Sequence, residues 1–328
     1  MAALPSTASE TGPAKLTTLL VSYNTESLLA PCLGALEAAL RDVQPNAIIA
    51  VDNASRDGSV ARLEAEHPRV RLIRSPSNVG FGRANNLAVP YLDSPYVLLL
   101  NTDAFVPEDG VAGPLAFMEA HPDCGILGVR LVGRDGVLQP SCRYFPTPLN
   151  LFAGRTGLLR GVAGRMVDDM DWDHAQVREC DWVPGCYYLV RREVIEQVGL
   201  FDPRFFLYYE EVDHCLAARR AGWKVMYYPD VSVVHIGGES AKSLGALSES
   251  GRQLESLQLE SGLLYFRKNH GLGAVLAYVA LDLLASLLLL ANSLRPGRDA
   301  AVRPGLRGRM GRLLRLAWCT GLGRQGTR

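Results

Sequence analysis

Three short polar clusters in the first third of the chain carry side chains that could bind a nucleotide or a metal ion. Each cluster follows an apolar run: SYN ends at Asn24, DN consists of Asp52 and Asn53, and NTD ends at Asp103. Carboxylate and amide groups can accept hydrogen bonds from a base or a ribose hydroxyl. A single cluster of this kind is equally well explained as a turn, because Asp, Asn and Ser are common turn formers.

Four apolar runs are predicted to be strands, at residues 16–22, 47–51, 70–73 and 96–100, and the first, second and fourth end in these clusters. Leucines at helical spacing separate the first two runs. Strands that alternate with helices predict an α/β fold, a Rossmann-like and mostly parallel sheet covered by helices. Ligands of such sheets bind beyond the carboxyl ends of the strands, so we expect all three clusters on one rim.

The sequence NVGFGRANN lies between the second and third clusters and contains groups suited to a diphosphate. Gly80 and Gly82 permit close approach of the backbone, and Arg83 can bridge phosphate oxygens. Asn85 and Asn86 are predicted to begin a helix whose positive end faces the same rim. The third glycine of a dinucleotide fingerprint is absent, so this is a different kind of nucleotide loop.

Residues 125–185 show little regular pattern, and regular structure is expected again after them. The sequence DWVPGCYYLVRREV indicates a turn and an apolar strand, and a short helix is predicted for residues 192–198. A second helix is predicted from Glu210 to Gly222, with Glu210, Glu211 and Asp213 in its first turn. The helix dipole favours acids there, so a structural role competes with a catalytic one. A further strand is predicted to end at His235.

Composition indicates a globular chain with an unusual C-terminal charge. The 328 residues are 48% hydrophobic and the net charge is zero, but residues 295–328 hold nine Arg and one acid, which gives +8 there and −8 elsewhere. Such a segment suits an anionic membrane surface or nucleic acid, or is simply solvated. Seven cysteines without a C-x-x-C pair indicate reduced thiols in a cytosolic protein. Residues 1–14 lack the features of a signal peptide and are predicted to be a disordered leader.

The C-terminal part is predicted to be helical and to associate with a membrane. Residues 272–291 are apolar except for Asp282 and Ser286, and Asp282 argues against a simple span. A helix that lies in the membrane interface or packs against the catalytic domain is preferred. The following segment has the pattern of a basic amphipathic helix, with apolar residues at Leu306, Met310, Leu313, Leu314 and Ala317.

Taken together in their order, the motifs SYN, VDNASRDGS, NVGFGRANN, LLNTD, WVPGCYYLVRR, FFLYYEEVD, GWKVMYYPD and VVHIGGES resemble the family 2 inverting glycosyltransferases of the GT-A fold. They span about residues 16–240. The sequences SCRYFPTP and LLYFRKNHG resemble the rhamnosyltransferase-like branch. The resemblance implies a GT-A domain at residues 15–270, followed by a membrane-associating tail at 271–328.

The resemblance also implies roles for individual residues. Asp103 would hold a divalent cation, Mg or Mn, on the donor diphosphate, His235 would complete the metal site, and Glu211 would be the catalytic base. Two departures from the family pattern stand out, since Asn101 replaces the first acid of a D-x-D motif and Glu211 replaces an aspartate. The predicted donor-binding residues are Ser22, Asn24, Asp52, Asn53, Asn78, Gly80, Arg83, Asn86 and Asp103. The predicted acceptor-binding residues are Trp182, Gly185, Tyr209 and Glu210, although buried packing explains both aromatic residues equally well.

The predicted function is that of a metal-dependent inverting glycosyltransferase. It would move a sugar, with rhamnose from dTDP-rhamnose favoured, to a hydroxyl of a glycan or lipid-linked saccharide at the inner face of the cell membrane. An alternative is a non-catalytic nucleotide- or glycan-binding member at the membrane surface, motivated by the two departures. A nucleotidyltransferase is disfavoured, because SYNTES is not a glycine-rich basic loop. Nucleic acid is not an expected partner.

Overall fold

The computed structural model describes residues 14–237, 247–298 and 300–328, with the backbone alone for residues 247–251. The predicted leader lies outside these ranges except for residue 14. The first half contains β1 (Leu16–Ser22), α1 (Glu26–Ala39), β2 (Asn46–Asp52), α2 (Ser59–Glu66), β3 (Arg71–Arg74), α3 (Phe81–Asn86), η1 (Val89–Tyr91), β4 (Tyr96–Asn101), β5 (Ala104–Phe105), α4 (Ala112–Ala120), β6 (Cys124–Val132), β7 (Leu138–Gln139) and α5 (Pro148–Thr156). The second half contains β8 (Arg178–Cys180), β9 (Tyr187–Arg191), α6 (Arg192–Val198), α7 (Glu210–Arg220), β10 (Lys224–His235), α9 (Leu247–Ser293) and α10 (Val302–Cys319).

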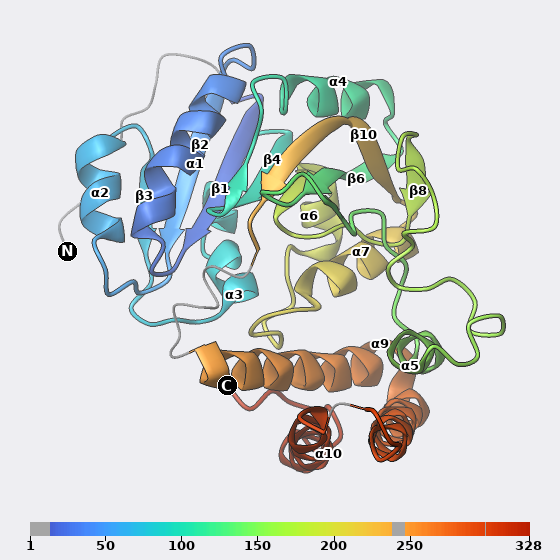
Figure 1. Ribbon diagram of the computed structural model, residues 1–328. Coiled ribbons are helices and arrows are strands. Elements are labelled where there is room, and N and C mark those ends of the chain that lie inside the picture. Colours follow the sequence, from blue (N-terminus) through green and yellow to red (C-terminus); the bar gives the residue numbers. More distant parts are fainter. Residues whose placement is uncertain (1–13, 238–246, 299) are drawn as a thin grey trace.

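One sheet organises the molecule, in the order β3-β2-β1-β4-β9-β6-β10-β5 (Figure 1). The ladders β2–β3, β1–β2, β1–β4 and β6–β10 are parallel, while β9 runs antiparallel between β4 and β6. β7 pairs with the outer part of β6, and the short β5 pairs with the end of β10. The prediction of an α/β fold with a mostly parallel sheet is confirmed.

Helices cover both faces of this sheet. Neighbouring residues of a strand point to opposite faces, and in β1 and β4 both sets of side chains are mostly apolar and buried. Leu20 and Leu100 belong to a buried cluster that includes α1, α2 and α4. Leu19 and Leu99 belong to a second cluster, to which α3, α6, α7, α9 and α10 contribute. β1 and β4 are therefore buried on both faces of the sheet, which explains why their sequences are largely apolar.

The carboxyl ends of β1, β2 and β4 lie together, as the apolar runs predict. Ser22 is paired with Asp52, and Val21 is paired with Asn101. The backbone N–H of Asn53 donates to the carbonyl of Ser22 at 2.8 Å. The SYN, DN and NTD clusters thus share one rim.

The region at residues 125–185 is more regular than its sequence indicates. It contains most of β6, an inner strand of the sheet, and also β7, α5 and β8. A second difference concerns α3, which ends at Asn86, where the sequence analysis places a helix start. The loop glycine Gly80 precedes this helix and has a φ of 89°.

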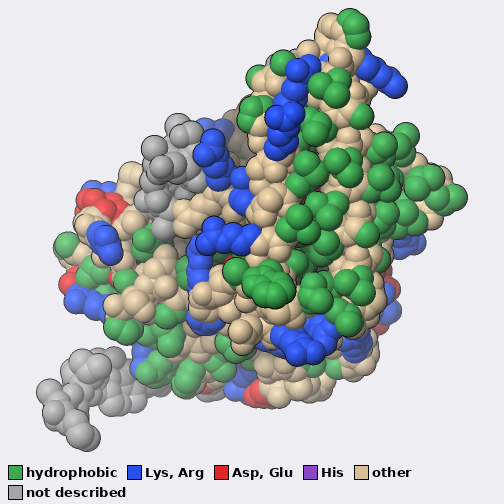
Figure 2. All heavy atoms as spheres, turned by 90° about the horizontal axis from the view of Figure 1, so that it is seen from below, with side chains coloured by type: hydrophobic (Ala, Val, Ile, Leu, Met, Phe, Trp, Pro, Cys, Tyr) green, Lys and Arg blue, Asp and Glu red, His purple; other side chains and the backbone are tan. Residues whose placement is uncertain are grey.

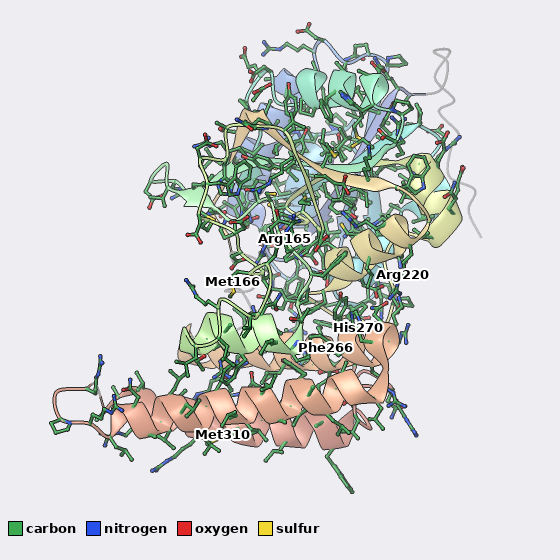
Figure 3. All side chains as sticks on the ribbon, turned by 90° about the vertical axis from the view of Figure 1, so that its right-hand side faces the viewer. Arg165, Met166, Arg220, Phe266, His270 and Met310 are labelled. Carbon is green, nitrogen blue, oxygen red and sulfur yellow. The ribbon has the colours of Figure 1, made fainter. Side chains whose placement is uncertain are left out.

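The C-terminal helices form a layer beneath the sheet and its covering helices. α9 changes direction at Gly271, where φ is 81°. Before this kink the helix contributes Leu263 and Phe266 to the core, and beyond it the helix packs with α5 and α10. Figure 3 shows Arg220, at the end of α7, near His270 at the kink, and Met310 in the outer helical layer.

Candidate active site

A cleft of about 260 Å³ opens at the shared rim. Its walls come from the strand ends, the α3 loop, the segment before β9 and the segment that leads into α7. The lining residues are Val21, Tyr23, Asn53, Asn78, Gly80, Phe81, Asn101, Thr102, Asp103, Pro184, Gly185, Cys186, Phe206, Leu207, Tyr208, Glu210, Glu211 and His235.

Many of the predicted site residues meet in this cleft. Those that line it are Asn53, Asn78, Gly80, Asp103, Gly185, Glu210, Glu211 and His235. Ser22 and Asn24 belong to the same rim and serve its backbone: the Ser22 hydroxyl bonds to that of Thr25, and Asn24 Oδ1 accepts from the Arg56 N–H. Neither Ser22 nor Asn24 lines the cleft.

The rim between β2 and α3 is held by hydrogen bonds of the amide side chains of Asn53 and Asn78. Asn53 Oδ1 accepts from the Val79 N–H at 2.9 Å, and its Nδ2 donates to Asn78 Oδ1 at 3.0 Å. A Cβ at Gly80 would lie 2.2 Å from the Phe206 carbonyl oxygen, so only glycine permits the close contact between these two walls. The loop is therefore held by hydrogen bonds and by close contact with the opposite wall.

Asp52 is buried at the end of β2 and does not itself line the cleft, but one of its oxygens has no partner among the described residues. One carboxylate oxygen accepts from the Ser55 N–H at 3.1 Å, whereas Oδ1 has no hydrogen-bond partner among the described residues. The side chain is only 3% exposed. A buried acceptor without a donor is costly, so a base N–H or a ribose hydroxyl would satisfy it.

Asp103 and His235 lie side by side where the end of β10 pairs with β5. Asp103 Oδ1 lies 3.6 Å from His235 Nε2, and the Ile236 N–H donates to the Asp103 carbonyl at 3.0 Å. Burial lowers the pKa of His235, against the opposing effect of the Asp103 charge. A neutral imidazole nitrogen beside a carboxylate is a donor set that suits a divalent cation.

This pair is small for a metal site built from protein alone. Within residues 14–237, 247–298 and 300–328, no group of three or more His, Cys, Asp or Glu side chains could hold a metal ion. Cations that assist phosphate chemistry are commonly bound by one or two protein groups together with substrate oxygens. Asp103 and His235 therefore fit a cation that a nucleotide diphosphate helps to bind.

Two adjacent carboxyl groups at the start of α7 form the opposite wall. Burial and the charge of Glu211 raise the pKa of Glu210 well above its ordinary value. Burial also raises the pKa of Glu211, although backbone N–H groups and Arg143 oppose this effect. Each side chain has one oxygen, Oε2, without a partner in the described part of the chain. The pair can hold one proton and leave the other carboxylate free to accept one.

Asp213, the third acid of this turn, is directed elsewhere. Its two oxygens accept from Lys268 Nζ at 2.6 Å and Asn269 Nδ2 at 2.7 Å, and it does not line the cleft. Lys268 also bonds to Asp202 at 2.7 Å. Asp213 thus ties α7 to α9, and it also lies in the first turn of α7, where the helix dipole favours an acid.

Four predicted binding residues have structural partners outside the cleft lining. Arg83 donates to the carbonyls of Pro203 and Arg328, and Asn86 exchanges hydrogen bonds with the backbone of Phe201. The Trp182 indole is 5% exposed and donates to the Tyr144 carbonyl. The Tyr209 ring packs on Tyr265. In this arrangement Arg83 does not line the cleft. Trp182 and Tyr209 pack against other residues, which agrees with the alternative reading that these aromatic side chains are buried for packing.

Sequence reasoning missed several wall residues. Phe206, Leu207 and Tyr208 line the cleft from the segment before α7, where Tyr208 and Tyr209 have φ values of 71° and 70°. The motif FFLYYEEVD marks this segment, but no single residue in it signals exposure to the cleft. Gln139, which contacts His235, lies in the region read as irregular.

The fold and cleft can now be compared with known proteins. Residues 17–164 match the model of glycosyl transferase family 2. An N-acetylglucosaminyl-diphospho-decaprenol L-rhamnosyltransferase of Mycobacterium tuberculosis is 28% identical over 240 residues, which cover 67% of this chain and 75% of the relative. The dTDP-rhamnosyl transferase RfbF of Shigella flexneri is 24% identical and is matched over 77% of this chain and 80% of its own length.

Among solved structures, the mannosyltransferase PcManGT of Pyrobaculum calidifontis, in complex with GDP-Man and Mn²⁺, has the same fold. The TM-score is 0.55 at 17% identity, over 95% of this chain and 88% of that one. The chain is therefore a glycosyltransferase with the GT-A fold, its residues 17–164 match family 2, and its sequence is similar to those of rhamnosyltransferases.

Proposed function

We propose that this enzyme transfers rhamnose from dTDP-rhamnose, with inversion and with the help of a divalent cation, to a hydroxyl of a lipid-linked saccharide or glycan. The observation that carries the proposal is that Asp103, His235 and Glu211 line one cleft with the amide rim of the donor side. A cation-binding pair and an unpaired carboxylate are the two groups that direct displacement at a sugar requires.

The donor is proposed to lie along the strand ends. Asp52 would accept from the base or the ribose through its unpartnered oxygen, and Asn53 and Asn78 would hold the loop against the nucleotide. Asp103 and His235 would bind the cation on the diphosphate. When bound, a cation neutralises charge that develops on the leaving diphosphate.

Glu211 is proposed to act on the acceptor. As the acceptor oxygen forms its bond to the anomeric carbon, Glu211 takes the hydroxyl proton and the bond to the diphosphate breaks. Attack from the face opposite the leaving group inverts the anomeric centre. Glu210, whose pKa is raised further by the neighbouring charge, would keep its proton and help to exclude water.

The choice of sugar rests on the relatives. Two proteins that match most of this chain are a rhamnosyltransferase acting on a diphospho-decaprenol acceptor and a dTDP-rhamnosyl transferase. Both the donor and the lipid-linked acceptor are therefore proposed by relationship, whereas the metal and base roles rest on the cleft.

The C-terminal layer supports a membrane location for the acceptor. Exposed leucines lie along one side of α9 beyond the kink, at Leu272, Leu276, Leu284, Leu287 and Leu288, and α10 adds Leu314 and Trp318. Figure 2 shows hydrophobic side chains gathered on this lower face with Lys and Arg side chains among them. An apolar face with basic neighbours suits the interface of an anionic membrane.

Asp282 does not interrupt this face, because it points inward. It is 6% exposed and forms ion pairs with Arg155 and Arg309 at 2.9 and 2.6 Å. By length and composition, α9 could also cross a bilayer. We favour attachment to the inner surface, because α9 beyond its kink packs on α5 and α10.

The donor test is a transfer assay with purified enzyme, a polyprenyl-diphosphate-linked N-acetylglucosamine acceptor, and Mn²⁺ or Mg²⁺. We expect turnover with dTDP-rhamnose to exceed that with UDP-N-acetylglucosamine and GDP-mannose, and to stop in EDTA. Asp103→Ala should lose cation dependence along with most of its turnover. Full activity in EDTA would contradict the metal role, and preference for another donor would contradict the sugar assignment.

The membrane test is sedimentation with vesicles. Leu287→Ser combined with Trp318→Ser should weaken binding to anionic vesicles, whereas Val137→Ser, which alters an exposed apolar residue away from this layer, should not. Binding should also fall as salt shortens the Debye length. Equal sedimentation of all three proteins with anionic and neutral vesicles would refute the proposed surface.

A further inference from the structure

Gln139 lies beside the proposed metal site without lining the cleft. It ends the two-residue strand β7, opposite Leu131 of β6. Its amide makes two hydrogen bonds to a single residue: Nε2 donates to the His235 carbonyl at 2.9 Å, and Oε1 lies 3.0 Å from His235 Nδ1. A side chain that contacts both the backbone and the ring of one histidine fixes the position of that ring.

The backbone contact also fixes which way the amide points. A carbonyl oxygen can only accept a hydrogen bond, so the NH₂ group of Gln139 must face the His235 carbonyl. Oε1 must then face the imidazole ring. The orientation follows from the chemistry of the partner and not from a choice between two similar atoms.

The tautomer of His235 follows from this orientation. Oε1 can only accept, so the ring nitrogen beside it, Nδ1, must carry the proton. In a neutral imidazole the other nitrogen, Nε2, then has a free lone pair. That lone pair lies 3.6 Å from Asp103 Oδ1, which is also an acceptor. A divalent cation bound by both acceptors would remove the repulsion between them.

Gly237 lies beside the His235 ring, and it is the positive φ of this residue that favours glycine. A Cβ at Gly237 would lie 3.6 Å from His235 Cε1, the carbon between the two nitrogens, and the residue has a φ of 77°. The chain after β10 thus turns back along the ring edge.

We propose that Gln139 is a positioning residue that holds His235 in the Nδ1–H tautomer and presents Nε2 to the divalent cation. The inference rests on the proposed metal role of Asp103 and His235. Partners that donate or accept at the second nitrogen of a metal-binding histidine commonly change metal affinity 10- to 100-fold. Gln139 is predicted to have an effect in this range.

The first experiment detects the tautomer without any metal. Long-range ¹H–¹⁵N spectra of the full chain at about pH 8, above the ordinary pKa of histidine, report which ring nitrogen carries the proton. The His235 signals are assigned from their loss in His235→Asn. Wild type should show the proton on Nδ1. Gln139→Ala should show a mixture of tautomers, and Gln139→Glu, which keeps an acceptor, should restore the wild-type spectrum.

The second experiment measures Mn²⁺ binding by electron paramagnetic resonance in the presence of dTDP. We expect Gln139→Ala to weaken binding about 10- to 100-fold. Gln139→Glu should bind at least as well as wild type. Val137→Ala, a change at an exposed residue two positions away, is the matched control and should bind normally. Melting temperatures of all variants identify any loss caused by unfolding.

The outcomes separate this inference from the proposed function. If wild type binds no Mn²⁺ with dTDP present, the metal role of Asp103 and His235 is wrong. If wild type binds Mn²⁺ and Gln139→Ala binds it equally well with Nδ1 still protonated, the metal role stands and the role of Gln139 is wrong. Weak Mn²⁺ binding by a folded Gln139→Glu that keeps the wild-type tautomer would also overturn the role of Gln139. The acceptor at position 139 would then not determine Mn²⁺ affinity.

Discussion

The cleft and the C-terminal helical layer both bury carboxyl groups, but they treat them differently. In the helical layer, Asp282 is held between the guanidinium groups of Arg155 and Arg309, which come from two other helices. In the cleft, Glu210 and Glu211 stand next to each other, and each keeps one oxygen without a partner in the described residues. The first arrangement neutralises a charge, whereas the second makes the pair compete for a proton.

This difference separates structural from functional acids on physical grounds. A buried charge is tolerated when opposite charges and hydrogen bonds compensate for its lost hydration. Without such compensation the carboxyl pKa rises, as it does for both glutamates, and proton exchange then occurs at a higher pH than for an exposed glutamate. The variants below test this comparison between paired and unpaired carboxyl groups.

The largest effect is expected for Glu211→Gln. The amide keeps the shape of the side chain but cannot accept the hydroxyl proton, so turnover should fall by about 10² to 10⁴. Donor affinity should barely change, because the donor is proposed to be held at Asp52 and the Asp103 pair. Steady-state kinetics and donor titration provide the measurement, and near-normal turnover would remove Glu211 from its role.

Asp282→Ala should show the opposite behaviour. The change leaves two partly buried guanidinium groups without their shared carboxylate and should lower the free energy of unfolding by about 3 to 5 kcal/mol. Turnover per folded molecule should stay close to wild type. Denaturant unfolding tests this, with Glu196→Ala, which removes an exposed ion pair with Arg192, as a control worth about 0.3 to 0.5 kcal/mol. Equal losses for the two variants would show that pairing at Asp282 is unimportant.

Asp213→Asn is expected to have an intermediate effect on stability. It removes the charge that pairs with Lys268 and should cost about 1.5 to 3 kcal/mol. Because Asp213 lies outside the cleft, donor affinity should be retained. If this variant kept its stability while losing as much turnover as Glu211→Gln, Asp213 would be the better candidate for the base.

The smallest effect is expected for Glu210→Gln, and it depends on pH. A carboxyl group whose pKa is raised by folding favours the folded state below its unfolded pKa, about 4.3, and this contribution is lost as the pH rises through the folded value. Gln has no such loss. The stability of the variant relative to wild type should therefore increase from about pH 4 to pH 8 in thermal unfolding. A difference in stability between variant and wild type that does not change with pH would show that folding does not raise the pKa of Glu210.

The fold was predictable where the strands are continuously apolar, and less so where they contain glycine. β1 matches its predicted bounds, whereas β6 was missed, because Gly125 and Gly128 weaken its strand pattern. The structure explains both glycines. A Cβ at Gly128 would lie 2.5 Å from Val183, and one at Gly125 would lie 2.8 Å from Trp223. A requirement of this kind comes from residues far along the chain, so local sequence cannot reveal it.

The same limit applies to the site. Asp103, Glu211 and His235 were predicted as a group from the resemblance of the ordered motifs to family 2 glycosyltransferases, and the three residues line one cleft. The direction of Arg83 was not predictable, since it depends on carbonyl groups of Pro203 and Arg328, which lie more than a hundred residues away. The roles of Asp103, Glu211 and His235 in binding and catalysis are predictions that the proposed variants test.

The pH dependence of turnover shows most directly whether Glu211, which has one oxygen without a partner among the described residues, is the catalytic base. Wild type should lose turnover as the pH falls, with an acid limb above the ordinary pKa of glutamate, because only the ionised form accepts the proton. In Glu211→Gln the residual turnover should be independent of pH across that range, while Glu210→Gln should keep the limb. An acid limb that persists in Glu211→Gln and disappears in Glu210→Gln would contradict the account.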